Sequence, residues 1–416
     1  MRTVAAAARQ NLRARRGHAG DALLTAFVAF WLDDYAVAAP VIQNTVSLLR
    51  RQAHGTGGDL RWPSGLTHAV WDDGLPVCVW DDEAWHELVE LQVRLISDAG
   101  AVRSLPLVLQ ERALAHAQAG EYREAAWLAE KIARLSELMG MTVPPYIPVL
   151  LAAESGRQDE ALALMESSLI AAVARGEGGA VTFIELERAV LYNGLGRYEE
   201  AWRSACVANE DPLGYVFWIL PELIEAAART GRRAEAAPAM DRLSEMAAVA
   251  RTSWVRGVEA RSRALLSDDA VAEDLYRSAI HHLRQSKDRP KLARTHLVFG
   301  EWLRRQGRRS DARDHLRIAY EMFSGWDSQA FAGRASAELL ATGERVRKRE
   351  PKRTNELTSQ EARIARLAAH GLSNREIGEQ LFISHRTVGY HLAKVFTKLG
   401  VSNRTQLHEV ISTDVS

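Results

Sequence analysis

The sequence has little cysteine and no long apolar run. Cys78 and Cys206 are its only two cysteines among 416 residues, and neither has a cysteine or histidine partner nearby. Metal and redox motifs need closely spaced ligands, so both are expected to be free thiols in a reducing cytoplasm. The longest apolar run, residues 22–32, is too short to cross a bilayer. The N-terminal residues do not follow a secretory signal pattern. We therefore expect a soluble, cytoplasmic protein without membrane contact.

Motifs for catalysis are also missing. Residues 55–58 (GTGG) do not include the lysine of a phosphate-binding loop. The paired acids in residues 71–73 (WDD) and 80–82 (WDD) are more typical of helix caps and turns than of acid–base or metal chemistry. His281 and His282 point in different directions on a helix and make a poor metal pair. We expect no enzymatic activity, no metal and no cofactor.

The sequence has no net charge, because 53 basic residues balance 53 acidic ones. Taken as a whole, this balance argues against a nucleic-acid partner. Its distribution argues the opposite. Residues 1–342 hold 40 basic and 45 acidic side chains, whereas residues 343–416 hold 13 basic and 8 acidic ones. Most of the basic excess lies in residues 343–356, which we interpret as an exposed linker.

One short pattern recurs within residues 1–342. It consists of a glycine, an acidic residue four positions later and then an alanine. The copies begin at Gly120, Gly156, Gly196, Gly231 and Gly307. A degenerate copy near residues 267–272 fills the longest gap, and looser versions precede the set at residues 33–35 and 81–83. Glycine suits the left-handed position after a helix, and an acid suits the first turn of the next helix. The alanine lets the two helices approach closely.

This period and pattern resemble tetratricopeptide-type repeats. The resemblance implies a solenoid of antiparallel helix pairs whose concave face binds a protein or a small-molecule ligand. The alternative is that the solenoid is only a spacer.

Residues 357–416 follow a different pattern. Thr358 with Glu361, and Ser373 with Glu376, each form a capping box that predicts a helix start. A third helix is expected from Ser384 to Gly400, and a fourth over residues 403–411. The third helix has an apolar stripe at helical spacing, formed by Val388, Leu392, Val395 and Leu399.

The opposite face of the third helix is expected to be exposed. On a helical wheel it presents Arg386, Tyr390, Ala393, Lys394 and Thr397. No acidic residue occurs between Gln380 and His408. Two helices joined by a tight turn, with an acid-free second helix, follow the helix-turn-helix plan and suit a groove lined by phosphates. The alternative is a solvated basic face without a partner.

Residues 371–391 (GLSNREIGEQLFISHRTVGYH) resemble the LuxR-type helix-turn-helix signature. The flanking residues 357–361 (LTSQE) and 398–405 (KLGVSNRT) also match it, so the resemblance spans about sixty residues. It implies a transcription regulator whose third helix lies in the major groove of double-stranded DNA and whose fourth helix supports a homodimer. The positions that carry over to DNA binding are Asn374, Ser384, Arg386, Thr387, Tyr390, Lys394, Lys398 and Arg404.

Three positions depart from the family pattern. Gly378 replaces the usual alanine, and Gly389 and Ala393 stand where many members have polar or basic side chains. Gly389 costs the helix about 1 kcal/mol relative to alanine. Either this glycine lets the backbone approach DNA closely, or it is a substitution that the helix merely tolerates. Base reading then falls mainly to Arg386, Tyr390 and Lys394, while His391 is expected to pack or to bond the backbone.

The expected fold class is all-α. A tetratricopeptide-like helical-repeat solenoid (1–342) precedes a basic linker (343–356) and a four-helix LuxR-type helix-turn-helix domain (357–416). The repeats are similar to the sensor region of large ATP-binding LuxR regulators of the maltose-regulator type, and the chain looks like the C-terminal half of that architecture. ATP switching is not carried over. The alternative function is a helical-repeat interaction or scaffold protein with a weak or vestigial DNA-binding domain.

Overall fold

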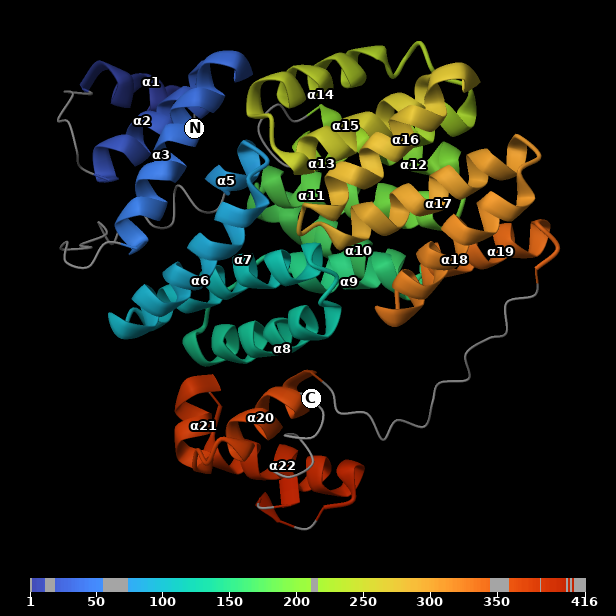
Figure 1. Ribbon diagram of the computed structural model, residues 1–416. Helices are drawn as coiled ribbons and strands as arrows, with labels where there is room; N and C mark the ends of the chain where they lie inside the picture. The colour runs from blue at the N-terminus through green and yellow to red at the C-terminus, as the bar shows by residue number, and fades with distance from the viewer. Residues whose placement is uncertain are drawn as a thin grey trace. The chain divides into compact units, whose positions relative to one another are not determined.

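Helices make up all of the regular structure that is described. The computed structural model describes residues 2–11, 19–54, 74–210, 216–344, 359–381, 383–401, 403–404 and 406–407. Within these ranges every element is an α-helix except one short 3-10 turn, η1 (Val102–Ser104). The chain divides into two compact units, Met1–Arg345 and Val346–Ser416 (Figure 1). The all-α prediction is confirmed for the described residues.

The first unit begins with the described helices that precede the recurring glycine pattern. They are α1 (Arg2–Asn11), α2 (Ala19–Leu32), α3 (Tyr35–His54), α5 (Leu75–Cys78) and α6 (Asp82–Asp98). Apolar side chains of α2, α3, α5 and α6 form one buried cluster. Gln43 Nε2 donates a hydrogen bond of 3.1 Å to the carbonyl of Ala250, so α3 is also tied to the end of a later helix.

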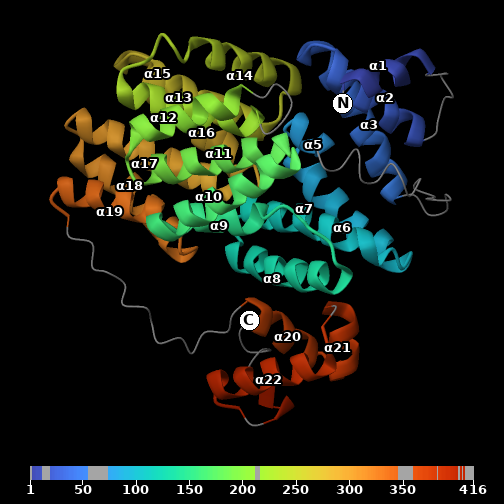
Figure 2. The same cartoon turned by 180° about the vertical axis from the view of Figure 1, so that it is seen from behind.

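Six helix pairs and a last single helix follow. The pairs are α7 (Leu105–Gln118) with α8 (Tyr122–Met139), α9 (Tyr146–Ser155) with α10 (Gln158–Arg175), α11 (Gly178–Gly194) with α12 (Tyr198–Asn209), α13 (Val216–Thr230) with α14 (Ala237–Ala250), α15 (Ser253–Leu266) with α16 (Asp269–Arg284), and α17 (Arg289–Arg305) with α18 (Arg309–Gly325). The single helix is α19 (Gln329–Ala341). The two members of each pair pack against one another, as Figures 1 and 2 show.

The recurring glycines lie between the two helices of a pair. All five have φ between +68° and +77°, the left-handed conformation that glycine adopts without strain. The alanine of each copy is fully buried, as is Ala272 in the degenerate copy. The acids lie in the first helical turn except in the fourth copy, where α14 begins at Ala237 and Glu235 precedes it. Pro238 explains this later start, because proline lacks an N–H and suits the first turn of a helix.

Residues far apart in the sequence meet inside the first unit. Helix α19 packs against α9 and α11, and a Cβ atom on Gly156 would lie 2.5 Å from the backbone nitrogen of Ala330. At the start of α6, Asp82 Oδ2 accepts hydrogen bonds of 2.6 Å from Ser286 Oγ and from the Lys287 amide. The start of α6 is therefore joined directly to the turn between α16 and α17, and α19 is joined to α9 and α11.

The second unit consists of α20 (Ser359–Ala369), α21 (Asn374–Leu381) and α22 (His385–Leu399). Its core includes Ile364, Ile377, Val388, Leu392 and Val395, all with at most 4% of their surface exposed. Leu407 is also fully buried and belongs to the expected fourth helix. The described part of that helix is short: Asn403 Oδ1 accepts a hydrogen bond of 2.9 Å from the Gln406 amide, as a helix cap does.

Several expectations fall outside the described residues. They concern the glycine-rich residues 55–58, the WDD sequence at 71–73, linker residues 345–356, the Thr358 cap and residues 408–411 of the fourth helix. Cys78 and Cys206 are not joined in a disulfide bond; Cys78 is buried and Cys206 is partly exposed. Among the helices that the structure describes, none is long and apolar enough to span a membrane.

Candidate DNA-binding face

Local hydrogen bonds fix the start of both helices in the predicted helix-turn-helix. The Ser373 amide donates to Glu376 Oε2 at 2.7 Å, and the Glu376 amide donates to Ser373 Oγ at 3.3 Å, which is the predicted capping box. Ser384 Oγ accepts a hydrogen bond of 3.1 Å from the Thr387 amide and caps α22. Gly400 has a φ of +67° and ends α22.

The turn between α21 and α22 is held by a close backbone contact. The Ile383 amide donates a hydrogen bond of 2.9 Å to the carbonyl of Gly378. A Cβ atom on Gly378 would lie only 2.6 Å from the carbonyl oxygen of Ile383. In this chain glycine at position 378 therefore permits the tight turn, which gives the departure from the usual alanine a packing explanation.

The exposed face of α22 carries the residues that the helical wheel placed there. Arg386, Tyr390, Ala393, Lys394 and Thr397 are all exposed, and Tyr390 keeps 60% of its surface accessible. Lys394 Nζ lies 4.4 Å from the centre of the Tyr390 ring, and the Tyr390 side chain raises the pKa of Lys394. The face thus combines two cations with an aromatic ring, the chemistry that suits phosphates and base edges.

Three of the predicted DNA-binding residues are bonded within the second unit. Lys398 Nζ lies 2.6 Å from Oε2 of Glu361, a carboxylate whose side chain is only 4% exposed. Arg404 donates hydrogen bonds to the carbonyl of Leu372 and to Oδ1 of Asn374. Lys398 thus joins α22 to α20, and Arg404 joins the residues after α22 to the start of α21. A DNA contact from Asn374, Lys398 or Arg404 stays a prediction.

The remaining positions lie at the start of α22 or within its first two turns. The hydroxyl oxygens of Ser384 and Thr387 are 2.8 Å apart, so both side chains take part in the helix cap. Gly389 faces Asn374, because a Cβ atom at position 389 would lie 3.5 Å from Nδ2 of Asn374. His391 is partly buried, and burial lowers its pKa. This placement agrees with a packing role for His391.

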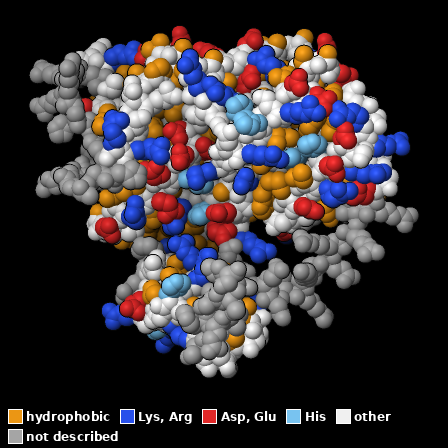
Figure 3. Space-filling view, in the orientation of Figure 1, with side chains coloured by type: hydrophobic (Ala, Val, Ile, Leu, Met, Phe, Trp, Pro, Cys, Tyr) orange, Lys and Arg blue, Asp and Glu red, His pale blue; other side chains and the backbone are white. Residues whose placement is uncertain are grey.

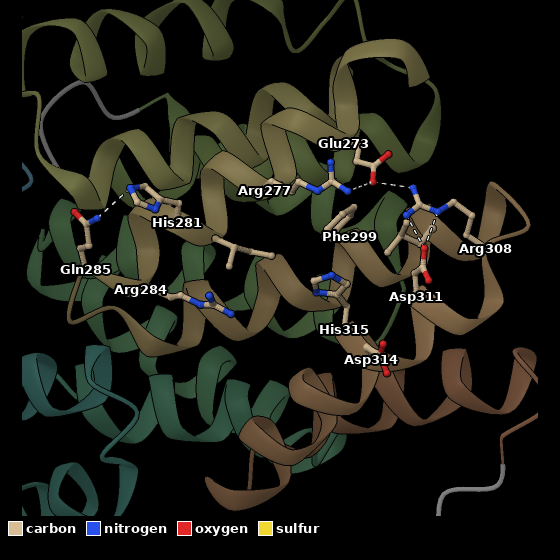
Figure 4. Close-up of a pocket in the computed structure, with 12 residues that line it drawn as sticks. Glu273, Arg277, His281, Arg284, Gln285, Phe299, Arg308, Asp311, Asp314 and His315 are labelled. Carbon is tan, nitrogen blue, oxygen red and sulfur yellow. Dashed lines mark hydrogen bonds and ion pairs between the residues drawn. The ribbon is translucent and has the colours of Figure 1, made fainter.

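The visible surface of the first unit mixes basic and acidic side chains without a large area of one sign (Figure 3). A groove of about 660 Å³ lies over α16, α17 and α18. Four of its charged side chains pair with one another: Arg308 lies 2.7 Å from Glu273 and 2.5 Å from Asp311, and Arg277 lies 2.6 Å from Glu273 (Figure 4). The His281 and His282 rings lie 5.3 Å apart, and the described residues hold no cluster of three metal-binding side chains.

The interior of the first unit holds charges that the sequence reading did not identify. Glu222 lies 2.8 Å from Lys291 and 2.6 Å from Arg294. Glu225 pairs with Arg294 at 2.9 Å and with Arg334 at 2.8 Å. Burial alone would raise the pKa of both glutamates, but the surrounding arginines and Lys291 lower it below its usual range. The available signal was an acid inside an apolar run, as in residues 183–190 (FIELERAV) and 219–226 (ILPELIEA).

Comparison with known proteins locates the relationship in the second unit. The family model for bacterial regulatory proteins of the luxR family matches residues 355–411. The HTH-type transcriptional regulator Rv0890c of Mycobacterium tuberculosis is 45% identical over 79 residues, which are 18% of this chain and 9% of that protein. The transcriptional regulatory protein LiaR of Bacillus subtilis is 41% identical over 75 residues, 18% of this chain and 33% of LiaR.

The HTH-type transcriptional regulator AlkS of Alcanivorax borkumensis is 39% identical over 79 residues, 17% of this chain and 9% of AlkS. The alignments therefore span between 9% and 33% of the length of these three relatives. The family match, the capped α21–turn–α22 geometry and the shared sequence agree. The C-terminal part of this chain is a LuxR-type helix-turn-helix DNA-binding domain of the kind found in transcription regulators.

Proposed function

We propose that this protein regulates transcription by placing α22 in the major groove of double-stranded DNA, while the helical first unit senses a ligand or a protein partner. The exposed face of α22 is the observation that carries the DNA-binding part. It presents Arg386, Tyr390 and Lys394 side by side on a helix whose opposite face is buried in the core. No catalytic step is part of this proposal.

Each side chain on this face has a distinct role. Arg386 lies in the first turn of α22, is exposed, and is assigned to the O6 and N7 atoms of a guanine. Tyr390 contacts a thymine methyl group or a phosphate. Lys394 neutralises a phosphate and positions the helix without reading sequence. The helix that begins near Asn403 is assigned to the homodimer contact, which places two copies of α22 on two half-sites.

The first unit is assigned the role of a tetratricopeptide-like solenoid. The repeated glycine turns, the buried alanines and the paired packing of successive helices support this assignment. Helical repeats of this kind form extended binding surfaces because each pair contacts mainly its neighbours. The contacts of α6 with the α16–α17 turn, and of α19 with α9 and α11, also join helices that are far apart in the sequence.

The experiment is selection of random DNA duplexes by the full chain, followed by affinity measurements for three variants. Arg386→Ala is expected to weaken binding and to relax the preference at one base position. Lys394→Ala is expected to weaken binding to all duplexes uniformly. Arg363→Ala, which removes an exposed arginine from α20, is the matched control and should change neither. The proposal fails if no sequence is enriched, or if Arg386→Ala leaves both affinity and preference unchanged.

A scaffold function is the second candidate. It is favoured by Ala393, which is exposed on the DNA-facing side of α22 but offers no hydrogen bond. A scaffold with a weak DNA-binding domain predicts salt-sensitive DNA binding without sequence preference, so the same selection experiment separates the two functions.

A further inference from the structure

A small cavity lies inside the first unit, among α7, α9, α11, α13 and α17. Its volume is about 100 Å³. Leu114, Leu150, Leu186 and Val190 supply apolar walls, and the rings of Trp218 and Trp254 also line it. A cavity of about 150 Å³ holds a benzene ring, so this smaller one suits a molecule of about four non-hydrogen atoms.

Five charged side chains line the cavity, and four of them are already bonded within the protein. Lys291 and Arg294 pair with Glu222 at 2.8 and 2.6 Å. Asp288 accepts a hydrogen bond of 2.8 Å from Trp254 Nε1. Glu154 accepts a hydrogen bond from the hydroxyl group of Ser328.

The fifth charged side chain, Glu187, differs from the other four. It is 95% buried, since only 5% of its surface is exposed, and it lines the cavity. Within the described residues, no hydrogen bond or ion pair joins its carboxyl group to a partner. A buried carboxyl group without a partner is costly, because its ionised form has lost water and gained nothing in exchange. The cavity therefore contains an acceptor that a ligand can satisfy.

We propose that this cavity binds a small alkylammonium ion, whose nitrogen donates a hydrogen bond to the Glu187 carboxylate while its alkyl groups fill the apolar part. This inference rests on the proposed ligand-sensing role of the first unit and gives the ligand a chemical class. A cation fits better than an anion because Glu222 already engages both lining cations, whereas the Glu187 carboxyl group is bonded to no cation among the described residues. Trp218 and Trp254 also line the cavity, and aromatic rings attract ammonium groups.

Proton release is a second signature of such binding. Burial raises the pKa of Glu187 to about 8, with a further contribution from Glu154 and opposition from Lys291. The other titratable or charged groups nearby are Tyr122, Glu222, Asp288 and Arg294. In the empty cavity at pH 7, Glu187 is thus mainly protonated. A bound cation stabilises the carboxylate, so binding releases a proton, and affinity should rise between pH 6 and pH 8 while the amine, with a pKa near about 10, stays charged.

The test is calorimetric titration of the full chain with three probes of similar size: isopropylammonium, isopropanol and acetate. Isopropylammonium should bind at least about tenfold more tightly than the other two, because it alone carries a positive charge that pairs with the ionised Glu187 carboxylate. It should release protons at pH 7, measured in buffers of different ionisation enthalpy. Glu187→Gln should lose this preference and the proton release. Glu137→Gln, which removes an exposed glutamate from α8, should retain both.

Glu187→Gln keeps the shape of the protonated side chain, so its thermal stability should stay close to that of the natural protein, which keeps the comparison valid. Equal affinity for isopropylammonium and isopropanol, or unchanged isopropylammonium binding by Glu187→Gln, would overturn the inference. So would the absence of any binding. The sensing role is tested separately by a chemically diverse small-molecule panel and by DNA affinity. A non-cationic ligand that changes DNA affinity leaves the sensing role intact and refutes the amine. Amine binding without any effect on DNA affinity supports the amine as ligand of the cavity and refutes the sensing role.

Discussion

Two lysines one turn apart on α22 are expected to affect DNA binding in different ways. Lys394 is exposed beside Tyr390 on the DNA-facing side. Lys398 is 24% exposed and lies 2.6 Å from the Glu361 carboxylate. Replacing each in turn by methionine removes the charge and keeps most of the apolar stem. The two variants are matched in helix and residue type, so a difference between them reports mainly the different surroundings of the two lysines.

The magnitudes follow from these surroundings. A lysine that neutralises one phosphate contributes about 0.9 to the slope of log affinity against log salt concentration. Lys394→Met should lower the slope by about that amount for each subunit and leave the folded state nearly unchanged. Lys398→Met should leave the slope unchanged but destabilise the second unit by about 3 kcal/mol, because the buried Glu361 carboxylate loses its cation.

The assay is the affinity of the full chain for its selected duplex at several salt concentrations, combined with thermal unfolding. The double variant Glu361→Gln/Lys398→Met is the control for stability. It should recover part of the loss, since no uncompensated buried charge remains. A slope that falls with Lys398→Met and not with Lys394→Met would show that the roles of the two lysines are reversed.

Three further predictions concern stability. Gly156→Ala should destabilise the first unit by several kcal/mol more than Gly176→Ala. Both glycines have a positive φ, but a Cβ atom at position 156 would lie 2.5 Å from the α19 backbone, whereas one at position 176 would have no atom within 4 Å. Equal losses of unfolding free energy in urea would contradict the α9–α19 contact. Gly389→Ala should stabilise α22 by about 1 kcal/mol, because a Cβ atom has room there. If the DNA affinity of this variant is unchanged, the glycine is a tolerated substitution; if the affinity falls markedly, the glycine allows the backbone to approach DNA closely. Burial lowers the pKa of His296 to about 3, so this histidine is neutral in the folded protein and takes up a proton on unfolding below about pH 6.5. Relative to His296→Asn, the natural protein should therefore lose about 2 kcal/mol of unfolding free energy between pH 7 and pH 5; parallel pH profiles would contradict this assignment.

The local structure was predictable because short-range sequence determines it. The five recurring glycines occupy left-handed positions, and their alanines are buried. Both requirements are set by a turn of a few residues. The same holds for the Ser373 and Ser384 caps and for the buried stripe of α22, where helical periodicity alone separates Val388 and Leu392 from Arg386 and Tyr390.

Long-range contacts were not predictable from the same patterns. Asp82 has the sequence context of a helix cap, yet its carboxylate accepts hydrogen bonds from Ser286 and Lys287, which lie 204 and 205 positions later in the sequence. Lys398 was predicted as a DNA contact from its place in the signature, but that pattern does not indicate its ion pair with Glu361 on another helix. The cavity around Glu187 exists only because helices from several repeats converge on it. Such contacts depend on the three-dimensional packing of the repeats, which a one-dimensional period does not specify.

The central claim, that α22 reads bases in the major groove, is tested most directly by guanine methylation interference with the selected duplex. Methylation at N7 blocks a major-groove acceptor that arginine uses. We predict that methylation of one guanine in each half-site abolishes binding of the natural chain, and that Arg386→Ala no longer distinguishes methylated from unmethylated DNA at that guanine. Interference that is absent, or that persists unchanged in Arg386→Ala, would contradict the claim.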